Sequence, residues 1–86
     1  MAKNRIELRP DTDIDAILGK VKAMYAGQSE VNVNDIDGVK IDFTDRWVHL
    51  RRSNTEPIIR VYSEAHTLQE AEEIGQQIVD IVQEML

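Results

Sequence analysis

Residues 39–63 of this chain read VKIDFTDRWVHLRRSNTEPIIRVYS, and apolar and polar side chains alternate along three short parts of the stretch. These parts are residues 39–43, 47–51 and 58–63. Alternation with a period of two is typical of strands that bury one face. The sequences Thr-Asp and Ser-Asn-Thr-Glu-Pro, which separate the parts, favour turns. We therefore predict three consecutive strands joined as antiparallel hairpins.

The segments on either side of this stretch predict a further strand and two helices. Residues 31–34 alternate valine with asparagine, as a short strand does, and Asp37-Gly38 supplies a hairpin turn. Residues 11–13 offer N-cap oxygens for a first helix, which Gly27 ends. Thr67 to Glu70 form a capping box that opens the last helix. The apolar stripes are Ile14, Ile17, Leu18, Val21, Met24 and Tyr25 in the first helix, and Leu68, Ala71, Ile74, Ile78, Ile81, Val82 and Met85 in the last.

Two amphipathic helices and a sheet with one apolar face can bury each other in two layers. We therefore predict an α+β two-layer sandwich with a roughly four-stranded, mainly antiparallel sheet and two amphipathic helices on one face. Residues 1–10 form an N-terminal linker or short strand in this prediction, and residues 11–86 form a single domain. A chain of 86 residues has no room for a second domain.

Composition restricts the environment and the chemistry. The chain has no cysteine, which excludes disulfides and thiolate metal sites. Its longest apolar runs are a few residues, far short of the ~20 needed to cross a bilayer, and no signal peptide is apparent after Met1. We expect a cytoplasmic protein without a membrane partner.

The net charge of −6 is unevenly distributed. Residues 1–60 contain all ten Lys and Arg residues and ten of the sixteen acids, whereas residues 61–86 contain six acids and no Lys or Arg. Residues 46–60 hold four arginines against one glutamate, a local charge of +3. A nucleic-acid footprint needs a broader basic surface, so we expect no nucleic-acid partner. A small positive site on an acidic chain better suits a compact anion.

The sequence RRSNTEP at residues 51–57 gathers the groups that hold a phosphate. Guanidinium forks, short hydroxyls and the N–H groups of a turn donate together to one anion. Pro57 fixes its own φ and favours an extended Glu56, so the loop is shaped before a ligand arrives. Composition alone favours an arginine-rich hairpin turn whose charges point into water.

Other kinds of site find little support. Asp35 to Gly38 has the wrong spacing for a calcium loop, and the two histidines lack a second metal ligand at a recognised spacing. We therefore expect no metal site in this chain. Ser53, His49 and Asp45 can be written as a catalytic triad, but no nucleophile-elbow sequence surrounds the serine.

The string RRSNTEP, followed by IIRVYSE up to Glu64, resembles the phosphate-binding loop in the C-terminal domain of the α-D-phosphohexomutases, the phosphoglucomutase and phosphomannomutase enzymes. The likeness is close across residues 50–64. Upstream, DGVKIDFTDRWVHLR at residues 37–51 is similar to the paired strands that precede that loop. The order of the remaining elements agrees with the same domain.

This resemblance implies a role in moving a phosphoryl group between the 1- and 6-positions of a hexose, through a phosphoserine and a bisphosphorylated sugar. The loop at residues 51–55 then clamps the substrate phosphate that is not transferred. Arg51 provides a bidentate charge contact, Ser53 and Thr55 donate hydroxyls, and Asn54 supplies an amide and accepts unusual backbone geometry.

Three further residues, Arg52, Glu56 and Arg60, are candidates for a supporting role beside the clamp. Arg60 is expected to brace the loop through Glu56 or Glu64. Arg52 stands where the family often has a small or uncharged residue, so it either adds a phosphate contact or faces solvent.

The resemblance also implies what this chain lacks. The family's phosphoserine segment, magnesium loop and sugar-recognition loop have no counterpart here, so the chain alone is expected to be inactive. The parent enzyme is expected to use Mg²⁺ and a hexose 1,6-bisphosphate intermediate, with a phosphosugar substrate and three other domains as partners. Asn54 stands where phosphoglucosamine mutases usually carry glycine, which favours a phosphomannomutase or phosphoglucomutase.

Two alternatives remain open at the level of sequence. The chain can be a non-catalytic protein-interaction module in which the arginine-rich hairpin loop binds no small ligand. A nucleic-acid binder that stacks bases on Trp47 and Tyr62 is the least favoured, because the chain is acidic overall.

Overall fold

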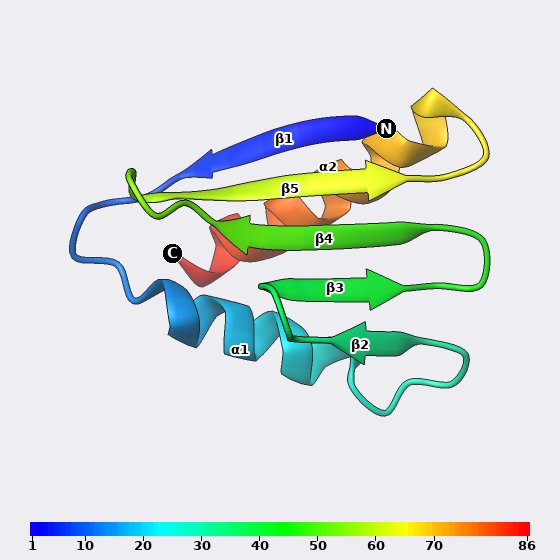
Figure 1. Ribbon diagram of the computed structural model, residues 1–86, viewed down its shortest axis with the longest axis horizontal. Helices are drawn as coiled ribbons and strands as arrows, with labels where there is room; N and C mark the ends of the chain where they lie inside the picture. Colours follow the sequence, from blue (N-terminus) through cyan, green and yellow to red (C-terminus); the bar gives the residue numbers. More distant parts are fainter.

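The computed structural model describes residues 1–86 and consists of one five-stranded sheet and two helices (Figure 1). The strands are β1 (Ala2–Glu7), β2 (Asn32–Asn34), β3 (Val39–Asp42), β4 (Trp47–Arg52) and β5 (Ile58–Glu64), and the helices are α1 (Ile14–Tyr25) and α2 (Leu68–Met85). Neighbouring strands are antiparallel throughout, in the spatial order β1-β5-β4-β3-β2.

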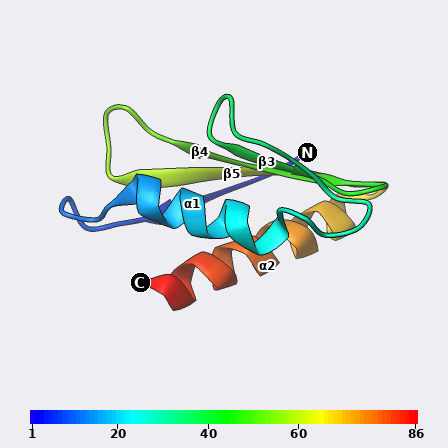
Figure 2. The same cartoon turned by 90° about the horizontal axis from the view of Figure 1, so that it is seen from below.

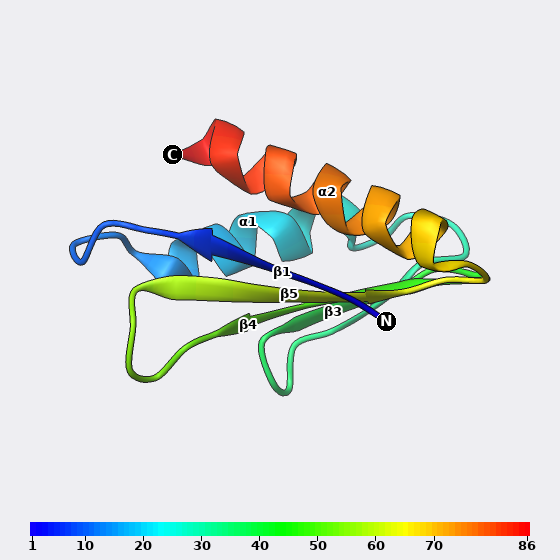
Figure 3. The same ribbon diagram turned by 90° about the horizontal axis from the view of Figure 1, so that it is seen from above.

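Both helices cover the same face of the sheet, as Figure 2 and Figure 3 show from opposite sides. The other face carries no helix and is called the open face below. The predicted α+β sandwich is therefore confirmed. The sheet has five strands where four were predicted, because Ala2–Glu7 pairs along its whole length with β5, from Ala2 opposite Ser63 to Glu7 opposite Ile58.

The alternation in β4 separates its two faces as the sequence predicts. Val48 and Leu50 are fully buried in the core between sheet and helices. Trp47 and His49 are half-buried, and Arg51 is exposed, on the open face. β5 follows the same rule, with Ile59 and Val61 buried in the core and Arg60 exposed on the open face.

Each helix begins at the cap that the sequence predicts. The side chain of Asp13 accepts a hydrogen bond from the Ala16 N–H at 3.1 Å, and Oγ1 of Thr67 accepts one from the Glu70 N–H at 3.1 Å. These contacts satisfy amides that have no partner within their helices.

The helices turn most of their predicted apolar stripes toward the sheet. Met24 and Leu68 are exceptions, with 46% and 58% of their surface exposed, because both lie near a helix end, beyond the edge of the core. Neither α1 nor α2 is both long enough and apolar enough to span a bilayer.

Two loops project from the open face on the side away from the helices (Figure 2). One is the β4–β5 connection, residues 53–57, called the 53–57 loop. The other is the β2–β3 connection, residues 35–38, called the β2–β3 tip. The sheet pairing sets both loops at the same end of strands β3 and β4, since Val39 lies opposite Leu50.

Candidate functional site

The 53–57 loop is held at both of its ends by backbone hydrogen bonds. The Ser53 N–H donates to the Ile58 carbonyl at 3.1 Å, and the Ile58 N–H donates to the Glu56 carbonyl at 2.8 Å across Pro57. The Leu8 N–H, just beyond β1, donates to the Pro57 carbonyl at 2.8 Å. The loop therefore keeps a fixed attachment to both neighbouring strands without any ligand.

Ser53 organises the interior of this loop. Its half-buried hydroxyl oxygen accepts from the N–H groups of Thr55 and Glu56, each at 3.3 Å, and lies 3.3 Å from Oγ1 of Thr55. Serine can accept and donate at once, so its proton stays available to an acceptor. Two hydroxyls and two backbone amides thus converge within one turn.

Asn54 is exposed at the tip of the 53–57 loop, but it does not have the backbone geometry that was expected of it. The only residue other than glycine with a positive φ is Glu30, at 64°. That part of the prediction is wrong, since the Ser53 hydroxyl closes the turn without a left-handed residue at Asn54. The amide side chain remains free to donate.

Arg51 and Arg52 point to opposite faces of the sheet. Nη2 of Arg51, on the open face, lies 3.2 Å from Oδ2 of Asp37 in the β2–β3 tip. Nη1 of Arg52 donates to Oδ1 of Asp15, on α1, at 2.8 Å. The structure therefore groups Arg51 with the open face and ties Arg52 to the helix layer.

The β2–β3 tip is fixed beside Arg51 by glycine geometry. Gly38 has a φ of 72°, and a Cβ atom built there would lie 2.1 Å from the Leu50 carbonyl oxygen. Only glycine fits such a close approach in that conformation. A ring nitrogen of His49 also contacts the Asp37 carbonyl oxygen. From the sequence we predicted Asp37 only as a turn residue. Its position beside Arg51 depends on the strand pairing, which the spacing of residues did not reveal.

A second contact joins the tip to α1. Nζ of Lys22, on α1, donates to Oδ2 of Asp35 at 2.6 Å. This hydrogen bond, with the charge of Lys22, lowers the pKa of the Asp35 carboxyl from its ordinary value.

Arg60 lies in the middle of a row of arginines that crosses three strands. It is directly opposite Arg51 in β4 and directly opposite Arg5 in β1. It forms an ion pair with neither Glu56 nor Glu64, so the bracing contact that we expected is absent. The reason is spacing, because Glu64 is four residues further along the strand, about 13 Å away at the usual rise per residue.

Like charges directly opposite each other on a sheet repel. Glu7, at 2.8 Å, reduces this repulsion at Arg5, and Asp37 reduces it at Arg51. Arg60 has no carboxylate partner. Within this row, three arginines against Glu7 and Asp37 thus leave one uncompensated positive charge, that of Arg60, on the open face, although the whole chain carries a charge of −6. This surface favours an anion.

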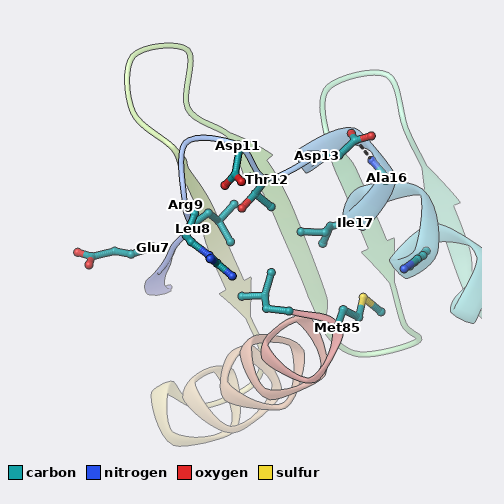
Figure 4. Close-up of a pocket in the computed structure, with 11 residues that line it drawn as sticks. Glu7, Leu8, Arg9, Asp11, Thr12, Asp13, Ala16, Ile17 and Met85 are labelled. Atoms are coloured by element: carbon teal, nitrogen blue, oxygen red, sulfur yellow. Dashed lines mark hydrogen bonds between the residues drawn. The ribbon is translucent and has the colours of Figure 1, made fainter.

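The largest hollow of the molecule lies elsewhere, as Figure 4 shows. It measures about 600 Å³ and is formed by the β1–α1 connection, the start of α1 and the end of α2. Glu7, Asp11 and Asp13 line it together with Arg9 and Lys20. Three carboxylates against two cations do not favour a phosphate, so size alone does not identify the anion site.

Nothing in the chain gathers a set of metal ligands. No three histidine or carboxylate side chains lie close enough together to hold a metal ion. Asp37, beside the open face, pairs with Arg51, and Asp15, on α1, pairs with Arg52. Each of these carboxylates therefore has one cationic side chain as its partner.

The sequence matches a known protein family. The family model described as "Phosphoglucomutase/phosphomannomutase, C-terminal domain" matches residues 4–81. The chain therefore belongs to the C-terminal domain family of the phosphohexomutases, as the RRSNTEP stretch indicated.

Curated relatives agree with this assignment. A phosphoglucosamine/phosphogalactosamine mutase of Sulfurisphaera tokodaii is 35% identical over 83 residues, which are 96% of this chain and 18% of the relative. A phosphoglucomutase/phosphomannomutase of Thermococcus kodakarensis is 40% identical over 74 residues, 86% of this chain and 16% of the relative. The chain thus spans less than a fifth of the length of these relatives.

The names of the relatives cover several sugars. A probable phosphoglucosamine mutase of Pyrococcus furiosus is 42% identical over 55 residues, 64% of this chain and 12% of the relative. Phosphoglucosamine mutases and phosphoglucomutase/phosphomannomutases are therefore both similar to this chain, and the preference drawn from Asn54 stays a prediction.

Proposed function

We propose that this domain holds the non-transferred phosphate of a hexose phosphate for a phosphohexomutase, and that Arg51, Ser53, Asn54 and Thr55 form the clamp. The observation that carries the proposal is the 53–57 loop itself. Its two hydroxyls lie 3.3 Å apart in the turn that follows β4, the strand that carries Arg51, and backbone hydrogen bonds fix the loop before any ligand is present. A preformed loop loses little conformational freedom on binding.

Each member of the clamp has a distinct chemical role. Arg51 offers two parallel N–H groups that match two phosphate oxygens. The Ser53 and Thr55 hydroxyls and the Asn54 amide donate to the remaining oxygens. Arg60, beside Arg51 and without a carboxylate partner, adds positive charge. Glu56 is exposed and forms no ion pair, so we assign it no contact with the phosphate.

Holding one phosphate places the other end of the sugar for reaction. Fixing a substrate in a reactive orientation removes a large part of an entropic barrier. The clamp makes no bond with the transferred group and moves no proton in this proposal. Its contribution to phosphoryl transfer is positioning and charge neutralisation.

The chemistry itself belongs to the rest of the parent enzyme in this proposal. A phosphoserine, a hexose 1,6-bisphosphate intermediate and Mg²⁺ are assigned to the three other domains, because the family segments that carry this chemistry have no counterpart in these 86 residues. The parent is proposed to be cytoplasmic, with a phosphosugar as substrate and neither nucleic acid nor membrane as partner.

An amide chemical-shift titration tests the clamp. Glucose 1-phosphate and mannose 1-phosphate are added to the chain, with glucose and sodium chloride as controls. We expect shifts confined to residues 51–55 and their neighbours with both phosphosugars, and none with glucose. The absence of any amide shift at millimolar phosphosugar would count against the clamp and favour a protein-interaction module.

A further inference from the structure

A carboxylate of this chain already lies at the guanidinium that the clamp uses. Oδ2 of Asp37 is 3.2 Å from Nη2 of Arg51, and both side chains are about half exposed or more. We propose that Asp37 is a specificity-determining residue, which occupies Arg51 in the ligand-free domain and yields only to a dianion that also engages the 53–57 loop. This inference rests on the proposed function.

The position of Asp37 is imposed by its surroundings. Gly38 packs against the backbone of Leu50, so the chain on one side of Asp37 is fixed against β4. A ring nitrogen of His49 contacts the Asp37 carbonyl oxygen. The carboxylate therefore has a short tether and stays close to Arg51.

A tethered carboxylate acts as a competitor with a high local concentration. Chloride offers one charge and cannot use the several donors of the loop at once, so it displaces such a competitor poorly. A phosphate dianion offers more charge, and its oxygens also accept from the Ser53 and Thr55 hydroxyls. Once displaced, Asp37 returns to water with little loss, since exposed ion pairs contribute little to stability. Asp37 thus separates phosphate esters from monovalent anions.

The test compares Asp37→Asn with Asp35→Asn. Both changes remove one negative charge from the β2–β3 tip, but Asp35 contacts Lys22 and not Arg51. Amide shifts during titration with inorganic phosphate give the affinity, first without and then with sodium chloride. We expect Asp37→Asn to bind phosphate about two- to five-fold more tightly than the unchanged chain, which is the free energy of an exposed ion pair expressed as affinity.

Competition by chloride distinguishes this proposal from a purely structural role of Asp37, because a structural role would not change that competition. Competition by chloride should become stronger in Asp37→Asn and stay unchanged in Asp35→Asn. Asp37→Ser, a second neutral turn-forming substitution, is measured beside it in case the asparagine variant loses its native amide pattern.

Two results overturn the inference separately from the clamp. Weaker phosphate binding by Asp37→Asn would mean that Asp37 orients Arg51. Equal effects of the Asp37 and Asp35 substitutions would mean that only net charge matters. If phosphate fails to bind any of the chains, the clamp is wrong, and this inference fails with it.

Discussion

At the scale of single residues, Gly38 decides whether the β2–β3 tip can approach β4. An alanine there would combine a positive φ with a Cβ 2.1 Å from the Leu50 carbonyl oxygen. We predict that Gly38→Ala lowers the free energy of unfolding by about 2–4 kcal/mol. Urea unfolding followed by circular dichroism measures this change.

Gly19 provides the matched control for that substitution. It lies on the exposed side of α1, and a Cβ built there meets nothing within 4 Å. Gly19→Ala should therefore raise the free energy of unfolding by about 0.5–1 kcal/mol through helix propensity. If both alanines changed stability equally, the close contact at Gly38 would be refuted.

Asp35 gives a second prediction at this scale. Lys22 lowers the folded-state pKa of its carboxyl, so the ionised form is favoured in the folded chain. The contribution to stability is then complete above the unfolded-state pKa, near 4, and is lost as the pH falls through the lowered folded-state value. The melting temperature of Asp35→Asn should be below that of the unchanged chain at pH 7, with the difference vanishing in strong acid.

Melting curves measured across this pH range check the direction of the predicted difference in melting temperature. Asp45→Asn is a suitable control, because the nearest cation to Asp45 is at 3.9 Å and not in hydrogen-bond range. A difference for Asp35→Asn that grew toward acid would contradict the assigned direction.

At the scale of elements, α2 depends on its N-cap. Thr67 Oγ1 is the acceptor for the Glu70 N–H, and the helix has no basic residue in its last turn to offset its dipole. We predict that Thr67→Ala lowers the free energy of unfolding by about 1 kcal/mol. Thr67→Ser retains the acceptor oxygen and should keep most of the stability. Equal losses in the two variants, measured by urea unfolding, would show that the cap is not responsible.

The strands and helices also show which structural features the sequence patterns could predict. Alternation correctly predicted the opposed faces of β4, including the burial of Val48 and Leu50. The β1 strand was predicted only as one of two possibilities, because six residues at a chain end carry a weak periodic signal. Caps at Asp13 and Thr67 were predicted well, since each cap is a contact between residues three apart.

Such patterns could not predict contacts between residues that are far apart in the sequence. The pairs Arg51–Asp37 and Arg52–Asp15 join residues 14 and 37 positions apart, and only the strand register and the placement of α1 bring them together. The expected bracing by Arg60 failed for the same reason, because it was drawn from nearness along the chain. The sequence predicted the composition of the loop and left its electrostatic surroundings undetermined.

At the scale of the whole molecule, the open face and α2 differ in charge. The open face carries the row of Arg5, Arg60 and Arg51, whereas α2 carries acidic residues and no Lys or Arg. The chain corresponds to less than a fifth of the relatives that it matches. We predict that the chain alone does not convert glucose 1-phosphate to glucose 6-phosphate.

A coupled assay for glucose 6-phosphate tests this, with the Thermococcus kodakarensis phosphoglucomutase/phosphomannomutase as the positive control. Turnover by the isolated chain above the buffer rate would show that it holds catalytic groups of its own. It would also refute the assignment of the chemistry to the other domains.

The central claim is that Arg51 and the 53–57 loop hold a phosphate, and the adjacent arginines test it most directly. Arg51→Ala and Arg52→Ala remove the same charge from neighbouring positions that face opposite sides of the sheet. The measurement is the affinity of each variant for glucose 1-phosphate from amide shifts. We predict a loss of about ten-fold or more for Arg51→Ala, as expected for a lost charged hydrogen bond, and a change within about three-fold for Arg52→Ala. Equal losses in both variants, or full binding by Arg51→Ala, would contradict the account.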